Sequence, residues 1–243
     1  NGINGKDTLF TKREQTTMWT PHVNYPVSDR AREVYGGRNF NGYGLGWGTT
    51  EYHGKQMVSH TGGYDGMYSA VTMLPTEKIG VVILTNTMDG IGTLLSYEII
   101  DRLLGLPQQD WKNRGINQDK GHWADRAARI KERTDARIMG TKPSMDVVAI
   151  SGLYRCPLFG DIRILEENGK LTIDFVHSPQ LKARLSHWHN DTYQLEWLEE
   201  QAWFEFGTVQ IQMNNSGKPS GLLFDVPNDD IFFEEIKAVR VTP

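Results

Sequence analysis

The sequence has 243 residues, of which 38% are hydrophobic, and a formal net charge of −4 at pH 7. This balance gives no reason to expect nucleic acid or an anionic membrane surface as a partner, and no apolar run approaches the roughly 18 residues of a membrane span. The single cysteine, Cys156, excludes an internal disulfide and a cysteine-based metal site, and we interpret it as a small buried hydrophobic residue.

The first expected element is a short helical segment within residues 6–19. Thr11 followed by Glu14 has the spacing of a capping box, in which each side chain bonds the backbone N–H of the other residue. Pro21 ends the segment, because a residue before proline avoids the helical conformation. Residues 23–41, with their interspersed charges, glycines and proline, are expected to form an exposed loop.

A set of strands follows this loop. The first is expected at residues 43–51, and a second short strand carries His60 and continues into a glycine-rich bend. Alternating apolar residues over 67–74 and a β-branched run over 79–85 predict two adjacent antiparallel strands. Residues 75–78 then form the turn of this hairpin.

Two helices are expected after the sheet. The apolar residues of 91–104 fall on one stripe and Gly105 closes the segment, which predicts a helix packed on the back of the sheet. Residues 106–121 lack periodicity and are expected to form a polar connector. Residues 122–139 predict a partly exposed helix, and we interpret its basic run as a solvated face. Nucleic-acid binding is the less favoured alternative, because aromatic residues are not interleaved with the basic ones.

From residue 147 onward the apolar pattern has a period of two. Short strands are expected at 150–155, 161–166, 170–176, 181–186, 192–198, 203–206, 209–213, 221–226 and 231–236, with Asn, Asp and Gly turns between them. Regular spacing of this kind predicts a small antiparallel barrel or a strongly curved sheet.

Together these elements predict an α+β protein. We expect a partial antiparallel sheet with packing helices in residues 1–106, a linker with a helix in 107–144, and a small antiparallel β-barrel in 145–243. A partial sheet leaves an edge without a partner, so self-association through that edge is expected.

The stretch around His60 has features that acyl transfer needs. A serine acyl-transfer enzyme aims two backbone N–H donors at the developing oxyanion, and glycines such as Gly62 and Gly63 let a substrate approach the backbone closely. The competing interpretation is that these glycines form only a bulge or turn and that His60 is a half-exposed strand residue.

The order of motifs around this stretch resembles the C-terminal half of the serine β-lactamase and penicillin-binding-protein superfamily, most closely its class C-like esterase and peptidase branch. The resemblance covers roughly the first half of the chain. It is carried by Gly-Tyr-Gly-Leu-Gly-Trp at 42–47, His-Thr-Gly-Gly at 60–63, Thr-Met-Leu-Pro at 72–75, Val-Val-Ile-Leu-Thr-Asn at 81–86, and the helix that follows.

The resemblance implies roles for four residues. Gly63 would supply an oxyanion N–H and His60 would act toward the nucleophile network, while Thr61 and Gly62 would contact the substrate. Many family members have lysine where His60 stands. Because a neutral imidazole is not a fixed cation, this exchange argues against β-lactam hydrolysis and against recognition of a substrate carboxylate.

The family nucleophile, a Ser-x-x-Lys, does not occur in these 243 residues, and neither does Tyr-x-Asn. The chain also opens without a start methionine or a signal segment. We therefore expect a C-terminal fragment of a longer enzyme, inactive alone. The parent would hydrolyse an ester, amide or D-amino-acid peptide bond of a small molecule or peptide through an acyl-enzyme, without a cofactor, and would be exported or periplasmic.

The C-terminal barrel resembles a lipocalin-like module. The resemblance is carried by Ser-Gly-Leu-Tyr at 151–154, Asn-Gly-Lys-Leu at 168–171 and Phe-Phe at 232–233. An alternative function is that the chain is a non-catalytic protein whose barrel binds an apolar ligand. A third is that the barrel only positions or regulates the catalytic domain.

One histidine pair in the barrel has a metal-like spacing. His187 and His189 are alternate residues of an expected strand, and His177 is a candidate third ligand. We favour surface histidines over a metal site, because a third ligand is not fixed by the pattern.

Overall fold

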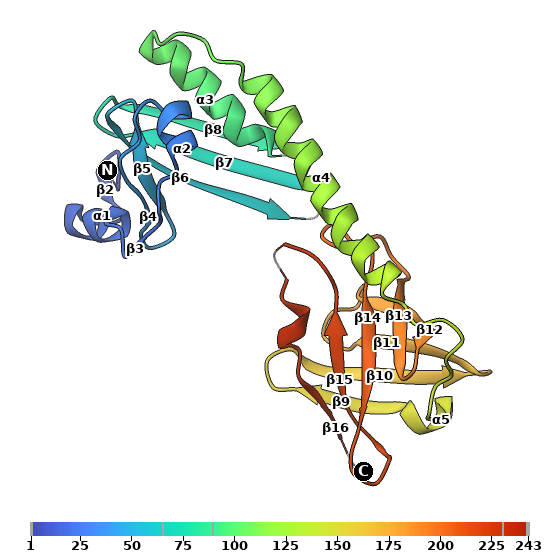
Figure 1. The fold of residues 1–243 in the computed structure, drawn as a ribbon. Helices are drawn as coiled ribbons and strands as arrows, with labels where there is room; N and C mark the ends of the chain where they lie inside the picture. Colours follow the sequence, from blue (N-terminus) through green and yellow to red (C-terminus); the bar gives the residue numbers. More distant parts are fainter. Residues whose placement is uncertain (1, 65, 89, 230, 242–243) are drawn as a thin grey trace. The chain divides into compact units, whose positions relative to one another are not determined.

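The computed structural model describes residues 2–64, 66–88, 90–229 and 231–241 (Figure 1). The chain forms two compact units, residues 1–120 and residues 121–243. Among the described residues, no helix combines the length and apolar character needed to span a membrane.

The N-terminal unit is built on a six-stranded antiparallel sheet whose strand order follows the chain. Its strands are β3 (Val23–Asn24), β4 (Asn41–Tyr43), β5 (Gly48–Tyr52), β6 (Lys55–Tyr64), β7 (Met67–Leu74) and β8 (Ile79–Thr85). The predicted hairpin at 67–85 is confirmed, with Leu74 opposite Ile79 across the turn. A separate two-stranded sheet joins β1 (Ile3–Asn4) to β2 (Asp7–Thr8).

Two short helices precede and interrupt the first strands of this unit. Helix α1 (Lys12–Trp19) carries the predicted capping box, since Thr11 Oγ1 accepts the Glu14 N–H at 3.2 Å and Glu14 accepts the Thr11 N–H. Helix α2 (Asp29–Val34), strand β3 and the first residue of β4 lie within residues 23–41, so the prediction of a loop there is wrong for these residues. Ser28 Oγ caps this helix by accepting the Ala31 N–H.

Helix α3 (Ile91–Leu104) is confirmed with the predicted bounds, and Gly105 ends it in the left-handed conformation with φ of 65°. The helix packs against β7 and β8 (Figure 1). Gly92 makes this approach close, because a Cβ at that position would lie 3.4 Å from Ala70 and from Ile83.

A buried carboxylate, Asp101, connects α3 to its neighbours. It accepts hydrogen bonds from the Tyr52 hydroxyl of β5 and, at 2.7 Å, from Trp111 Nε1. Only 1% of Asp101 is exposed. Helix α4 (Trp111–Asp135) begins after Asp110, whose carboxylate accepts the Asn113 N–H at 3.1 Å, so the prediction of a polar connector over 106–121 is wrong from Trp111 onward. The indole also stacks on Tyr97, with ring centroids 4.9 Å apart.

The C-terminal unit is a closed, eight-stranded antiparallel barrel, as predicted. Its strands are β9 (Gly152–Cys156), β10 (Gly160–Glu167), β11 (Lys170–Phe175), β12 (Lys182–His189), β13 (Thr192–Trp197), β14 (Thr208–Met213), β15 (Pro219–Asp225) and β16 (Ala238–Arg240). Pairing of β16 with β9 closes the barrel. A short helix, α5 (Val147–Ile150), precedes β9, and Cys156 is buried, as predicted.

Two predicted strands of this unit do not form. Residues 203–206 are irregular, and the 231–236 segment contains the 3₁₀ helix η1 (Phe233–Glu235) instead of a strand. Four apolar residues of these segments, Phe204, Phe206, Phe233 and Ile236, are nevertheless buried, whereas Ile231 and Phe232 are exposed. Phe233 packs edge to face with Phe204, at 5.0 Å between ring centroids, and its ring also lies 6.3 Å from that of Phe224. The apolar pattern thus reflects the filling of the barrel core rather than strand pairing.

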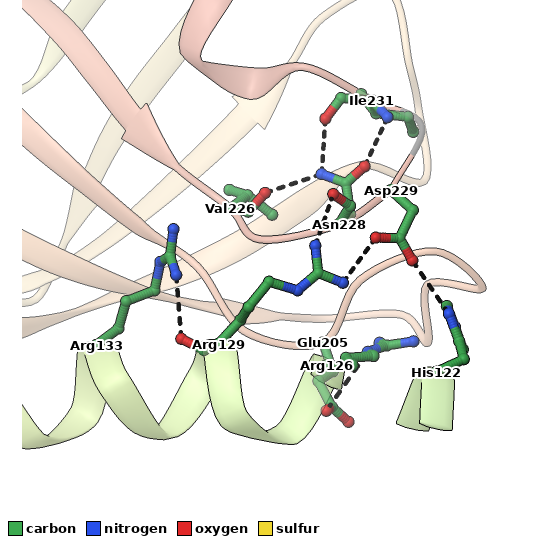
Figure 2. A network of polar contacts seen from close by, with 9 residues as sticks. All are labelled: His122, Arg126, Arg129, Arg133, Glu205, Val226, Asn228, Asp229 and Ile231. Atoms are coloured by element: carbon green, nitrogen blue, oxygen red, sulfur yellow. Dashed lines mark hydrogen bonds and ion pairs between the residues drawn. The ribbon is translucent and has the colours of Figure 1, made fainter. Parts of the chain in front are cut away.

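The basic run of α4 docks on the barrel, which corrects the prediction of a solvated face (Figure 2). Arg129 pairs with Asp229 at 2.7 Å and Arg133 pairs with Asp225 at 2.8 Å. The side chain of Asn228 bonds the backbone of its own loop and so fixes the segment that presents Asp229. Part of α4 is therefore held by charge pairs rather than by an apolar stripe.

Burial of Tyr97 predicts a loss of stability at alkaline pH. Desolvation raises the pKa of this phenol to about 12, although Arg38 lowers it in part. The folded state thus favours the neutral phenol, so its contribution is complete below pH 10 and is lost between pH 10 and about 12. The two-unit shift corresponds to about 3 kcal/mol.

Urea unfolding of the N-terminal unit at increasing pH measures this loss. The Tyr97→Phe variant should lose less stability above pH 10 than the parent chain, whereas Tyr25→Phe, at an exposed position, should follow the parent. Equal alkaline losses in the parent chain and in Tyr97→Phe would contradict the prediction.

Candidate functional site

The site lies on the second half of β6, where the strand has only one neighbour among the described residues. Pairing with β5 ends at Gly48 opposite Ser59, whereas pairing with β7 continues to Tyr64 opposite Met67. The chain before Gly48 turns away, since the Gly44 N–H bonds the Trp47 carbonyl at 2.7 Å. Residues 60–64 of β6 therefore have an open backbone edge.

The direction of each amide along this edge follows from strand alternation. The Ser59 carbonyl faces Gly48 of β5, because a Cβ on that glycine would lie 3.2 Å from this oxygen. Backbone polar groups of successive strand residues point to opposite sides, so those of Thr61 and Gly63 also point to the β5 side. Beyond Ser59 this side is open. Within the part of the chain that the structure describes, the N–H groups of Thr61 and Gly63 thus have no strand partner, as an oxyanion site requires.

His60 and Gly62 lie on the sheet face opposite α3. Across the sheet, His60 is opposite Val71 and then Val82, and Gly62 is opposite Ser69 and then Leu84. Side chains of such cross-strand neighbours share one face, and Val82 and Leu84 are 61% and 77% exposed. Thr61 lies in the row of Ala70, on the face that α3 covers. His60 is therefore accessible on an apolar, exposed sheet face beside the open edge.

Tyr43 joins the site from β4, across β5. Its hydroxyl oxygen lies 2.9 Å from His60 Nε2, and the two rings are 6.0 Å apart at their centroids. Gly48 of β5 is opposite Tyr43 on one side and Ser59 on the other. Because it is a glycine, β5 has no side chain between Tyr43 and β6. The sequence predicted a single strand over 43–51 with Tyr43 at its start, which is wrong: Tyr43 ends β4, and residues 44–47 form a turn before β5. Its place in the Gly-Tyr-Gly-Leu-Gly-Trp motif was the signal that could have identified it.

The structure thus brings the four predicted residues, His60, Thr61, Gly62 and Gly63, onto one exposed strand segment. Their roles stay predictions. The geometry provides backbone donors, a hydrogen-bonded imidazole and access for a substrate, which together suit stabilisation of an oxyanion.

The histidines of the barrel have other contacts. His187 Nε2 lies 2.9 Å from the Asn190 carbonyl, and His189 Nδ1 accepts the Ile138 N–H. The register of β12 shifts between these two histidines, so they do not follow simple alternation. Within the described part of the chain, no three His, Cys, Asp or Glu residues form a group that could hold a metal ion.

Comparison with known families gives one match in each unit. Residues 14–103 match the β-lactamase family, and residues 136–240 match a domain family of unknown function, DUF3471. The first match contains β6 and the whole segment from Tyr43 to Gly63.

Two curated relatives are fungal hydrolases. The chain is 41% identical over 71 residues to the unguisins hydrolase ungD of Aspergillus violaceofuscus, covering 28% of this chain and 12% of the relative. It is 35% identical over 75 residues to the unguisins hydrolase ungD' of Aspergillus campestris, covering 28% and 14%. The chain therefore spans a small part of the length of these relatives.

Among solved structures, the chain is similar to the octameric penicillin-binding protein homologue from Pyrococcus abyssi, with a TM-score of 0.38 and 14% identity over 97% of this chain and 43% of that one. It is also similar to SurE with D-Leu, with a TM-score of 0.31 and 14% identity over 96% and 44%. On the sequence matches, residues 14–103 are similar to the β-lactamase family, and the two curated relatives are both named as hydrolases.

Proposed function

We propose that the segment from Tyr43 to Gly63 forms one wall of the active site of a serine hydrolase that works through an acyl-enzyme. The observation that carries the proposal is the open edge of β6, with the Thr61 and Gly63 N–H groups unpaired beyond Ser59. This segment lies within residues 14–103, which match the β-lactamase family, and this match supports the same proposal.

In this proposal, the Gly63 N–H stabilises the charge that develops on the substrate carbonyl oxygen. A serine Oγ attacks the carbonyl carbon while its proton passes to the lysine, and the carbonyl oxygen becomes an oxyanion. The carbonyl then re-forms as the bond to the leaving group breaks, the leaving group takes the proton from the lysine, and the acyl-enzyme remains. The serine and its lysine would belong to a Ser-x-x-Lys segment, which these 243 residues do not contain. That segment would also supply the second oxyanion donor.

His60 and Tyr43 are proposed to present a hydrogen-bonded, proton-carrying pair beside this edge. Tyr43 fixes the position of the imidazole through the 2.9 Å contact to Nε2. Because His60 is not a permanent cation, the pair suits a neutral ester or amide better than a substrate recognised through its carboxylate. We infer the substrate class as an ester, an amide or a D-amino-acid peptide bond.

The alternative of an apolar ligand inside the barrel is less favoured. The rings of Phe175, Phe224 and Phe233 contact one another within the barrel core, so side chains occupy the space that such a ligand would need. We also retain three further proposals. The barrel positions the catalytic domain, the chain self-associates through the edge of β8, and the protein is exported or periplasmic.

The direct test compares this chain with a longer polypeptide that joins it to a Ser-x-x-Lys segment. With a p-nitrophenyl ester, the longer protein should show burst acylation and the 243 residues alone should show none. In the longer protein, Gly63→Pro should lower kcat about 100- to 1,000-fold, because it removes one oxyanion donor.

Gly63→Ala is the matched control, since it keeps the N–H and should retain most of the activity. Proline is acceptable for folding here because the N–H faces an open edge and makes no ladder bond. A burst from the 243 residues alone, or full activity of Gly63→Pro, would refute the proposal.

The contact between Tyr43 and His60 can be tested in the 243-residue chain. Tyr43→Phe keeps the ring but removes the hydroxyl, so the ¹⁵N resonance of His60 Nε2 should shift as its hydrogen bond is lost. Tyr25→Phe should leave that resonance in place. An unchanged His60 signal in Tyr43→Phe would remove Tyr43 from the site.

A further inference from the structure

The C-terminal unit has a cavity of about 380 Å³ between α4 and the segment that follows β13. Trp123 and Arg126 line it from the helix, and Trp197 and Phe204 line it from the barrel. The residues that line this cavity include none from the proposed acyl-transfer wall, and the inference below does not depend on the proposed function.

Two buried donors in the lining lack acceptors among the described residues. Arg126 is only 9% exposed, and its Nε has no hydrogen-bond partner. Arg126 forms an ion pair with the largely exposed Glu205, but the 3.7 Å between Nε and Glu205 Oε1 is too long for a hydrogen bond (Figure 2). Trp197 Nε1 is also buried and unpaired. Because buried donors are almost always paired, two such groups in one cavity wall indicate an acceptor that the chain does not supply.

The arginine is held in place rather than free to move to another partner. Arg129, on the following turn of α4, is fixed to Asp229 of the barrel (Figure 2), and Arg133, one turn further, is fixed to Asp225. The Arg126 guanidinium also lies over the Trp123 ring, at 5.3 Å from its centroid. The donor is therefore preorganised for a planar anion such as a carboxylate.

The charges of the lining restrict the ligand further. Three glutamates, Glu199, Glu200 and Glu205, also line the cavity and are exposed to solvent. All three would repel a simple anion. Glu205 already pairs with Arg126, and Glu199 and Glu200 would attract an ammonium group next to the carboxylate. The aromatic walls suit an apolar side chain.

We propose that this cavity binds a free α-amino acid with an aromatic or large aliphatic side chain. Its carboxylate accepts from Arg126 and Trp197, its ammonium lies toward the glutamates, and its side chain packs against Trp123 and Phe204.

L-Phenylalanine is the probe, titrated into the 243-residue chain and followed by calorimetry and by the indole N–H resonances. It should bind with a Kd on the order of 1 mM, which is ordinary for so small a ligand. The Trp197 Nε1–H resonance should shift as the hydrogen bond forms. Phenylalaninamide, without the carboxylate, and N-acetyl-phenylalanine, without the ammonium, should each bind about tenfold more weakly.

Variants separate binding from folding. Arg126→Gln should weaken phenylalanine binding about tenfold, and Trp197→Phe, which keeps an aromatic ring but lacks the N–H, about fivefold. Arg163→Gln, the same exchange at an exposed barrel position, should bind as the parent chain does. If Arg126→Gln unfolds, the Trp197→Phe result and the three-ligand comparison still decide.

Absence of phenylalanine binding at 10 mM would overturn the proposal. Equal or tighter binding of phenylalaninamide would overturn the carboxylate contact, and equal binding of N-acetyl-phenylalanine would overturn the role of the glutamates.

Discussion

The unequal length of two neighbouring strands is the constraint on which the candidate site depends. Strand β6 has ten residues and β5 has five, so the first half of β6 is paired on both sides and the second half on one. Backbone groups that a full sheet would use for pairing are left free at Thr61 and Gly63. The glycines keep this edge unobstructed, because no side chain at 62 or 63 stands between the backbone and a substrate.

The buried polar contacts of the N-terminal unit keep β5 in place. Tyr52, at the other end of β5 from Gly48, bonds Asp101 of α3, and Trp111 bonds the same carboxylate. A buried carboxylate is costly unless its acceptors are used, and here both oxygens accept from buried donors. The position of β5 relative to β6, and with it the point where the open edge begins, is thus fixed from beneath the sheet.

Local patterns predicted the elements whose cause is local. The bounds of α3, the capping box of α1 and the hairpin of β7 and β8 follow from apolar periodicity, capping chemistry and turn residues. The start of α4 was missed although Asp110 caps it locally by accepting the Asn113 N–H, because residues 106–121 lack the apolar periodicity on which the prediction relied. The docked basic run of α4 was misinterpreted because its partners, Asp225 and Asp229, lie about 90 to 100 residues away along the chain.

The candidate site likewise has one part that a local motif predicted and another part that depends on the pairing of strands. His60, Thr61, Gly62 and Gly63 are consecutive, so one motif identified all four. Tyr43 belongs to another strand and reaches His60 only across β5, so its contact depends on the sheet register. The open edge itself also required the register, because it exists only where β5 stops.

Amide hydrogen exchange along β6 tests this open edge most directly. In the 243-residue chain, the amides of Thr61 and Gly63 should exchange fast, whereas those of His60 and Gly62, which face β7, should be markedly slower. Equal protection of all four amides, or protection of Gly63 above that of Gly62, would show that the edge is closed and would contradict the account.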